Sequence, residues 1–403
     1  MRRRAAVTGV GVVSAAGLTC GAFWESLRAG RSAIAPLQCV EPGALRFARG
    51  AEVRGFDPLA HFEPKQIDFL DRFAQFAVVA AREAVRDAGI AWTPELRRRA
   101  AIVTGSCVGG QSSEDSEFVE LYKKNRPRVH PLTIARVMAN AGASHISMDL
   151  GVTGPCFTVS TACSSANHAI GQAVWMLRSG MADLVIAGGS EAPFSLGHLK
   201  AWEAMRVVSP DTCRPFSRDR KGMILGEGAA MLVLEPLERA RARGVRVYGE
   251  VCGFGMSADA HHLTQPAKDG ARRAMAAALA DAGVPPEAVG YINAHGTGTS
   301  ANDPTECAAI REVFGGHGDR LAVSSTKSIH GHALGAAGAL EAAATLLALR
   351  DGFLPPTANF TAADPECDLD VIPNKGRAAE VEYALSNSFA FGGLNAVLVF
   401  RKA

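Results

Sequence analysis

Four short segments of the sequence bring together residue types that could perform acyl transfer. The first is VSTACSS, residues 159–165, in which Cys163 stands where a segment with helical periodicity, residues 164–178, begins. The free N–H groups and the dipole of a helix N-terminus stabilise an anion. This placement therefore predicts a lowered thiol pKa and a nucleophilic thiolate at Cys163. A buried structural cysteine is an equally good interpretation of the placement alone.

The second segment, YINAHGTGT at residues 291–299, leads from a predicted strand into His295 and a Gly/Thr-rich loop. Asp303 and Glu306 follow shortly after it. A histidine at the end of a strand, rather than on its face, points toward the rim of a pocket. A loop histidine that only caps backbone carbonyls is the alternative, and the pattern alone slightly favours it.

The third segment, SSTKSIHGHALGAAG at residues 324–338, leads from a predicted strand through Lys327 and His332 into a helix of small residues. The run of Gly and Ala lets this helix approach another backbone closely. A solvated lysine is the alternative for Lys327. His330 and His332 could form a metal pair, but no third ligand stands at the spacing of a metal site, so we predict no metal.

The fourth segment, SNSFAFGGLN at residues 386–395, comes just before the last predicted strand. Its Gly-Gly turn beside Phe391 supplies free backbone N–H groups, which can form an oxyanion hole. Core packing is the alternative for Phe389 and Phe391. Taken together, the four segments offer one cysteine, two histidines, one lysine and free donors, a set suited to acyl transfer through a thiol.

The elements that would position these segments alternate along the whole chain, which predicts an α/β fold with strands covered on both faces. Predicted strands cover residues 5–13, 100–104, 184–188, 229–235, 245–253, 290–294, 321–324 and 396–401. Predicted helices cover residues 73–88, 164–178, 270–283 and 335–349. The charged run 235–246 is the best boundary and divides the chain into residues 1–245 and 246–403, between which no sequence repeat is visible.

Composition narrows the class of protein. The 403 residues are 48% hydrophobic and 20% charged, which excludes a disordered chain, and a net charge of +2 gives no reason to expect nucleic acid or a membrane surface. Nine cysteines without a C-x-x-C pair indicate a reducing compartment.

Two features near the N-terminus resemble other motifs. Arginines at 2–4 followed by an apolar stretch imitate a signal peptide, and TGVGVVS half-matches G-x-G-x-x-G. Both are better interpreted as a strand with a structural glycine turn. No segment is long and apolar enough to span a membrane.

In this order, the motifs resemble those of the β-ketoacyl-acyl carrier protein synthases, in the Cys-His-His subgroup of the condensing enzymes. The resemblance covers nearly the whole chain, through VTGVGVVSAAG, TACSSANHAIGQA, NAHGTGT, STKSIHGHALGAAG and SNSFAFGGLNA. It is nearest to the chain-elongating synthase II type, including the nodulation-type synthases. It implies a thiolase-like fold, a five-layered αβαβα arrangement built from two similar halves, and a homodimer.

The resemblance also implies a role for each motif residue. Cys163 matches the nucleophile, His295 and His332 match the two catalytic histidines, and Lys327 matches the family lysine. The remaining matches are Asp303, Glu306 and Glu341 as support for the site, Val108, Phe389 and Phe391 at the acyl channel or its gate, and the backbone N–H groups of Cys163 and Phe391 as the oxyanion hole. An asparagine at 332 would have indicated another subgroup, and loss of Cys163 a non-catalytic chain-length partner.

The implied reaction condenses an acyl chain on Cys163 with malonyl-acyl carrier protein, in fatty acid or polyketide-type elongation in the cytoplasm, without cofactor or metal. Because carrier proteins of this pathway are acidic, we expect a local basic patch. Its candidates are Lys65, Lys123, Lys124, Arg126, Arg128 and Arg206. Three alternatives stay open: a subunit that binds a partner and shapes its product, a Cys–His hydrolase, and a thiolase. The thiolase fits poorly, because Cys367, the last cysteine, lacks a C-x-G setting.

Overall fold

A computed structural model of the chain describes residues 3–403, so Arg2 of the basic triplet lies outside the described residues. Ten strands form its central β-structure: β1 (Ala5–Ser14), β4 (Ala100–Gly105), β5 (Cys156–Val159), β6 (Leu184–Glu191), β7 (Gly228–Pro236), β8 (Gly249–Ala258), β9 (Val289–Asn293), β10 (Ala322–Ser324), β13 (Tyr383–Ala390) and β14 (Leu394–Lys402). Two small ribbons, β2 (Ala35–Pro36) with β3 (Arg49–Gly50) and β11 (Phe353–Leu354) with β12 (Arg377–Ala378), lie apart from it.

The ten strands form two similar sets of five. The order along the sheet is β10-β9-β13-β14-β8-β1-β7-β6-β4-β5. Going outward from β1, the neighbours β7, β6, β4 and β5 join by two antiparallel and then two parallel pairings. Going outward from β8, the neighbours β14, β13, β9 and β10 repeat that series. The second half of the chain thus repeats the topology of the first, although no repeat is visible in the sequence.

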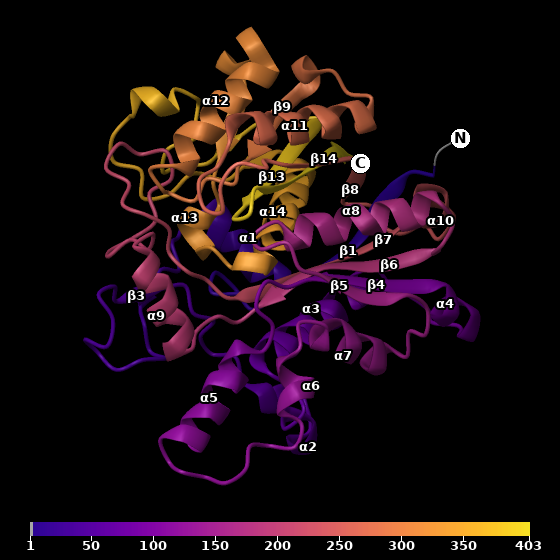
Figure 1. Cartoon of the computed structure of the whole chain (residues 1–403). Coiled ribbons are helices and arrows are strands. Elements are labelled where there is room, and N and C mark those ends of the chain that lie inside the picture. Colours follow the sequence, from indigo (N-terminus) through magenta and orange to yellow (C-terminus); the bar gives the residue numbers. More distant parts are fainter. Residues whose placement is uncertain (1–2) are drawn as a thin grey trace.

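Helices cover both sets of strands (Figure 1). They are α1 (Cys20–Arg28), α2 (Pro64–Ile67), α3 (Arg72–Asp87), α4 (Pro94–Arg99), α5 (Gln111–Tyr122), α6 (Thr133–Val137), α7 (Ala141–Leu150), α8 (Ser165–Arg178), α9 (Leu196–Met205), α10 (Leu237–Ala242), α11 (Lys268–Ala282), α12 (Asn302–Phe314), α13 (Lys327–His330) and α14 (Ala337–Asp351). Helices α8 and α14 contact strands of both sets and form the middle layer. Helix α3 covers the first set and α11 the second, which completes five layers.

Small residues allow these layers to approach closely. In α14 every residue from 337 to 349 is buried, as expected for a helix that is apolar on all sides. On β1, a Cβ added at Gly9 or Gly11 would lie 2.0 Å from a backbone oxygen of α3. The glycines of the partial G-x-G-x-x-G motif therefore lie on a strand against α3 rather than in the predicted turn.

All eight predicted strands and four predicted helices exist, with shifted ends. Strand β8 begins at Gly249 instead of 245, and the charged run before it contains the short helix α10. Strands β5 and β13 were not predicted. The polar SNS of β13 has the composition of a turn, yet the strand is paired on both sides and those residues are buried. Across residues 3–403, no helix combines the length and hydropathy needed to cross a membrane.

Candidate active site

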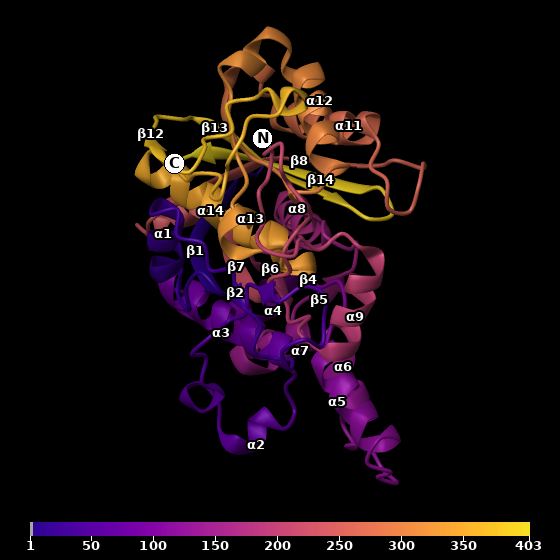
Figure 2. The ribbon, with the colours of Figure 1, turned by 90° about the vertical axis from the view of Figure 1, so that its left-hand side faces the viewer.

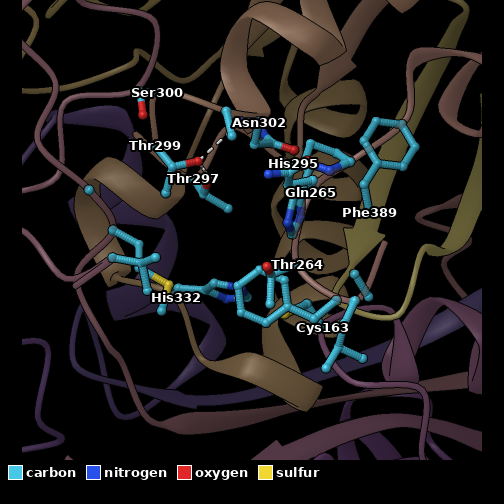
Figure 3. A pocket seen from close by; sticks show the side chains of 18 of the residues that line it. Cys163, Thr264, Gln265, His295, Thr297, Thr299, Ser300, Asn302, His332 and Phe389 are labelled. Atoms are coloured by element: carbon cyan, nitrogen blue, oxygen red, sulfur yellow. Dashed lines mark hydrogen bonds between the residues drawn. The ribbon is translucent and has the colours of Figure 1, made fainter. Parts of the chain in front are cut away.

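One cavity brings together side chains that lie far apart in the sequence (Figure 3). It encloses about 1010 Å³ of empty space, its open mouth included, and Cys163, His295, His332, Phe389 and Phe391 all contribute to its wall. These residues come from the turn before α8, the ends of β9 and α13, and the β13–β14 hairpin. All four predicted segments therefore meet at this cavity.

Cys163 is presented by a tight turn two residues before α8 begins. Ala162 has a left-handed φ of +50°, a conformation that is uncommon for a residue with a Cβ and often found at functional sites. The backbone N–H groups of Phe391 and of Cys163 itself donate toward the thiol, and Lys327 contributes a positive charge. Burial outweighs these effects and raises the pKa of Cys163 to about 11, so the predicted lowering of this pKa by the helix N-terminus is wrong.

The two histidines face each other across the cavity. Their ring centroids are 5.5 Å apart and the ring planes are at 85°. The Nδ1 of His332 accepts a hydrogen bond from the backbone N–H of Leu334 at 3.2 Å. A neutral His332 therefore carries its proton on Nε2. Burial and the charge of Lys327 hold the pKa of both imidazoles well below 6.5, so both rings are neutral at physiological pH.

Lys327 is fully buried behind the cavity, so its interpretation as a solvated lysine is wrong. Its Nζ donates to the backbone oxygen of His295 at 2.6 Å and forms an ion pair with Glu341. Lys327 is the first residue of the short helix α13 and does not lie in a loop. Glu341 is equally buried, which raises the pKa of its carboxyl group against the opposing effect of Lys327. Together, Lys327 and Glu341 stabilise the backbone at His295, just beyond the end of β9, from inside the protein.

Two further carboxylates hold the loop after His295. Glu306 accepts the backbone N–H groups of His295 and Gly296, each at 2.8 Å. Asp303 accepts the N–H of Phe216 at 2.8 Å and of Gly298 at 3.1 Å. Both acids are fully buried on α12, and burial raises the pKa of Asp303 to about 6. Asp303 and Glu306 thus contact the backbone of the histidine loop, and neither belongs to the cavity wall of the described residues.

Of the three residues of the predicted acyl channel, Phe389 and Phe391 line the cavity and Val108 does not. Phe389 lies 6.1 Å from His295, ring to ring, and Phe391 stacks on Trp202 at 6.1 Å. Trp202 lines the cavity, but nothing in the spacing of α9 singled it out in the sequence. Val108 does not belong to the wall of this cavity among the described residues. Its backbone N–H instead contacts Glu191, a buried acid that the sequence did not point to either.

The predicted basic residues do not form one patch. Arg206 lines the cavity, together with Arg220 and Lys221, which sequence reasoning missed. The other candidates are Lys65 on α2 and Lys123, Lys124, Arg126 and Arg128 at and beyond the end of α5. Figure 2 shows α5 projecting away from the strands that carry the site. Lys124 and Arg126 both pair with Glu120.

Comparison with known proteins gives concordant matches over the chain. The family model "Beta-ketoacyl synthase, N-terminal domain" matches residues 2–240, and "Beta-ketoacyl synthase, C-terminal domain" matches residues 248–361. Nodulation protein E of Rhizobium sp. (strain N33) is 48% identical, with 100% of both chains covered. The 3-oxoacyl-[acyl-carrier-protein] synthase 2 of Synechocystis sp. (strain ATCC 27184 / PCC 6803 / Kazusa) is 40% identical over 100% of this chain and 98% of the relative. The solved ishigamide ketosynthase/chain length factor superposes with a TM-score of 0.95 at 39% identity, with both chains fully covered.

Proposed function

The chain belongs to the β-ketoacyl synthase family, and we propose that Cys163, His295 and His332 carry out its reaction. It is a condensing acyltransferase of the 3-oxoacyl-[acyl-carrier-protein] synthase type with the thiolase-like fold, and it acts in fatty acid or polyketide elongation. The observation that supports the residue roles best is the cavity in which the thiol and two neutral imidazoles meet.

In the first half-reaction, the Cys163 sulfur attacks the thioester of an acyl chain on the carrier protein. The oxyanion of the tetrahedral intermediate is stabilised by the backbone N–H groups of Cys163 and Phe391, which already donate toward the sulfur. The bond to Cys163 forms first, and the carbon–sulfur bond to the carrier breaks when this intermediate collapses. The proton lost by Cys163 ends on the carrier thiol, so the step is balanced without another reactant.

In the second half-reaction, malonyl-carrier protein loses CO₂ and its carbon attacks the acyl group on Cys163. The negative charge left by CO₂ moves to the thioester oxygen of an enolate. The Nε2–H of His332 and an N–H of His295 donate to this oxygen, and their low pKa values keep both rings as neutral donors. Attack releases the 3-ketoacyl product, and the Cys163 thiolate takes up one proton.

Lys327, Asp303, Glu306 and Glu341 act behind the reacting groups. Lys327, paired with Glu341, holds the backbone at His295 and provides a positive potential for the Cys163 sulfur, while Asp303 and Glu306 fix the loop after His295. Phe391 gates the site, together with its stacked neighbour Trp202. Arg206 at the cavity receives the acidic carrier protein, and we retain the basic residues near α5 as a second and weaker contact.

The chain is proposed to act as a homodimer in the cytoplasm, with residues 1–245 and 246–403 as its two halves. Strand β5 is the outermost strand of the first set, with exposed residues Cys156 and Phe157. Such an unpaired edge can be covered by the same strand of a second copy. The cytoplasmic location rests on the nine cysteines without disulfide spacing.

A reconstituted assay tests the proposal. Malonyl-carrier protein is mixed with a panel of acyl-carrier primers, and the products are identified by mass. The wild type should give 3-ketoacyl products, and Cys163→Ala should give none because no acyl-enzyme can form. Condensation by Cys163→Ala, or none by the wild type with any primer, would refute the assigned roles. The second outcome would favour a subunit that shapes a partner's product.

A further inference from the structure

Glu191, the last residue of β6, is a fully buried acid that the proposed mechanism does not use. It accepts four hydrogen bonds: from Ser106 Oγ at 3.0 Å, Cys107 N at 2.6 Å, Val108 N at 3.3 Å and Gly335 N at 3.0 Å. No ion pair joins it to a cation within the part of the chain that the structure describes. All four partners are donors, so the site fits a carboxylate, which can only accept. Burial without a cation is costly even for a hydrogen-bonded carboxylate, and it raises the pKa of Glu191 to about 7 against the effect of these hydrogen bonds, which indicates a role beyond packing.

Only two hydrogen bonds separate Glu191 from the ring of His332. The N–H of Gly335 donates to Glu191, and the N–H of the preceding Leu334 donates to His332 Nδ1. Leu334 has a left-handed φ of +45°, so this segment is held in a conformation that it would not favour alone. A Cβ added at Gly335 would lie 2.4 Å from Cys107 N and 2.6 Å from Glu191 Oε2. The segment is therefore clamped between the imidazole and the carboxylate.

We propose that Glu191 is a positioning residue for His332: it anchors the segment after His332 to the loop after β4 and thereby aims Nε2–H at the reacting oxygen. This inference rests on the proposed function of His332. In Glu191→Gln, an NH₂ donor replaces one of the two acceptor oxygens, so it faces Val108 N on the Oε1 side or Cys107 N and Gly335 N on the Oε2 side, and the bonding of the remaining oxygen weakens with the loss of the negative charge. The anchor at Gly335 would loosen, and the imidazole would lose the N–H bond that fixes its tautomer and orientation.

The test separates the two half-reactions. Acylation of Cys163 by acyl-carrier protein is followed by the mass of the intact protein, and decarboxylation of malonyl-carrier protein by release of labelled CO₂. Glu191→Gln should slow decarboxylation by about 10- to 100-fold, the effect of misplacing a reacting group by ~1 Å. Acylation should change by less than about threefold, because its oxyanion donors are on Cys163 and Phe391. A merely structural role would lower both rates together.

Glu235→Gln is the matched control. Glu235 is also fully buried and accepts from Thr8 Oγ1 at 2.8 Å, but unlike Glu191 it pairs with two arginines, Arg239 and Arg243. It lies toward the opposite end of the β6–β7 pair, since Glu191 is opposite Gly228 and Val185 is opposite Leu234. This variant should lower the melting temperature without altering the ratio of the two rates.

Gly335→Ala provides a second route to the same result, because its methyl group would push the segment away from Glu191 without removing the acid. It should reproduce the selective loss of decarboxylation. Equal loss of both half-reactions in Glu191→Gln and Gly335→Ala, or no loss in either, would overturn the positioning role. His332→Ala is the reference: if it decarboxylates normally, the proposed function of His332 fails, and that failure is distinct from a negative result at Glu191.

Discussion

The ionisation of Cys163 gives a quantitative test of the site. Burial raises the pKa of this thiol to about 11, with Lys327 and two backbone N–H groups opposing the rise and Glu341 adding to it. At pH 7 only about one thiol in 10,000 is then a thiolate, and that fraction grows about tenfold for each pH unit up to pH 10. Lys327→Met should slow alkylation at each pH from 7 to 10, by about tenfold for each unit by which loss of the lysine raises the thiol pKa. Glu341→Gln should accelerate it, because a negative charge is removed.

The assay is alkylation by iodoacetamide between pH 7 and 10, resolved by peptide mass so that each cysteine is followed separately. Cys39 is the internal control, since it is exposed, does not belong to the edge strand β5 of the proposed dimer, and has neither Lys327 nor Glu341 among the causes of its pKa shift. Its rate should be the same in wild type and both variants. A midpoint for Cys163 at or below pH 8.5, the value of a free thiol, would refute the claim that burial dominates. Equal rates in Lys327→Met and Glu341→Gln would refute the opposed effects of the buried pair.

Three further predictions follow from the charges around the cavity. His332→Ala and His295→Ala should each lower the rate of decarboxylation about 10²- to 10³-fold. Because the pKa values of both imidazoles lie well below 6.5, a pH profile of the wild-type rate should show no imidazole titration between pH 6 and 9. The pKa of Asp303 rises from 3.8 to about 6 on folding, so its contribution to stability is complete below pH 3.8 and is lost as the pH rises through 6. Between pH 4 and 6, the melting temperature of the wild type should therefore fall relative to that of Asp303→Asn. Arg206→Glu should weaken carrier-protein binding and flatten its salt dependence in a titration, whereas Lys123→Glu, at the end of the projecting helix α5, should have a much smaller effect.

The sequence predicted the alternating α/β fold and the segments that meet at the cavity, because chemistry-bearing residues stood at the ends of strands. It predicted the wrong direction for the pKa of Cys163. The helix N-terminus was visible in the local pattern, whereas burial depends on layers supplied by the whole chain. The same reason explains Lys327, whose partner Glu341 lies a helical segment away and whose burial no local pattern reports.

Glu191 was missed for a different reason. Three of its four partners are backbone N–H groups, which every residue other than proline offers, so no side-chain pattern marks the contact. Strand β13 was missed because its Ser and Asn residues resemble a turn. Asn387 on that strand in fact donates to Glu306 at 3.1 Å, which links the strand to the histidine loop. The Ser and Asn residues of β13 are thus polar because they serve the site, and their polarity hid the strand pattern in the sequence.

The placement of the buried acids leaves the two imidazoles as neutral donors beside Cys163. Glu306 and Glu191 bind backbone N–H groups behind the cavity wall, and Lys327 is occupied by Glu341 and the His295 carbonyl. Around Cys163, the groups left to meet the substrate are then neutral donors. The enolate oxygen finds the imidazole N–H groups of His295 and His332 fixed in advance. Loss of CO₂ moves the negative charge to that oxygen, so the arrangement favours decarboxylation without transferring a proton to carbon.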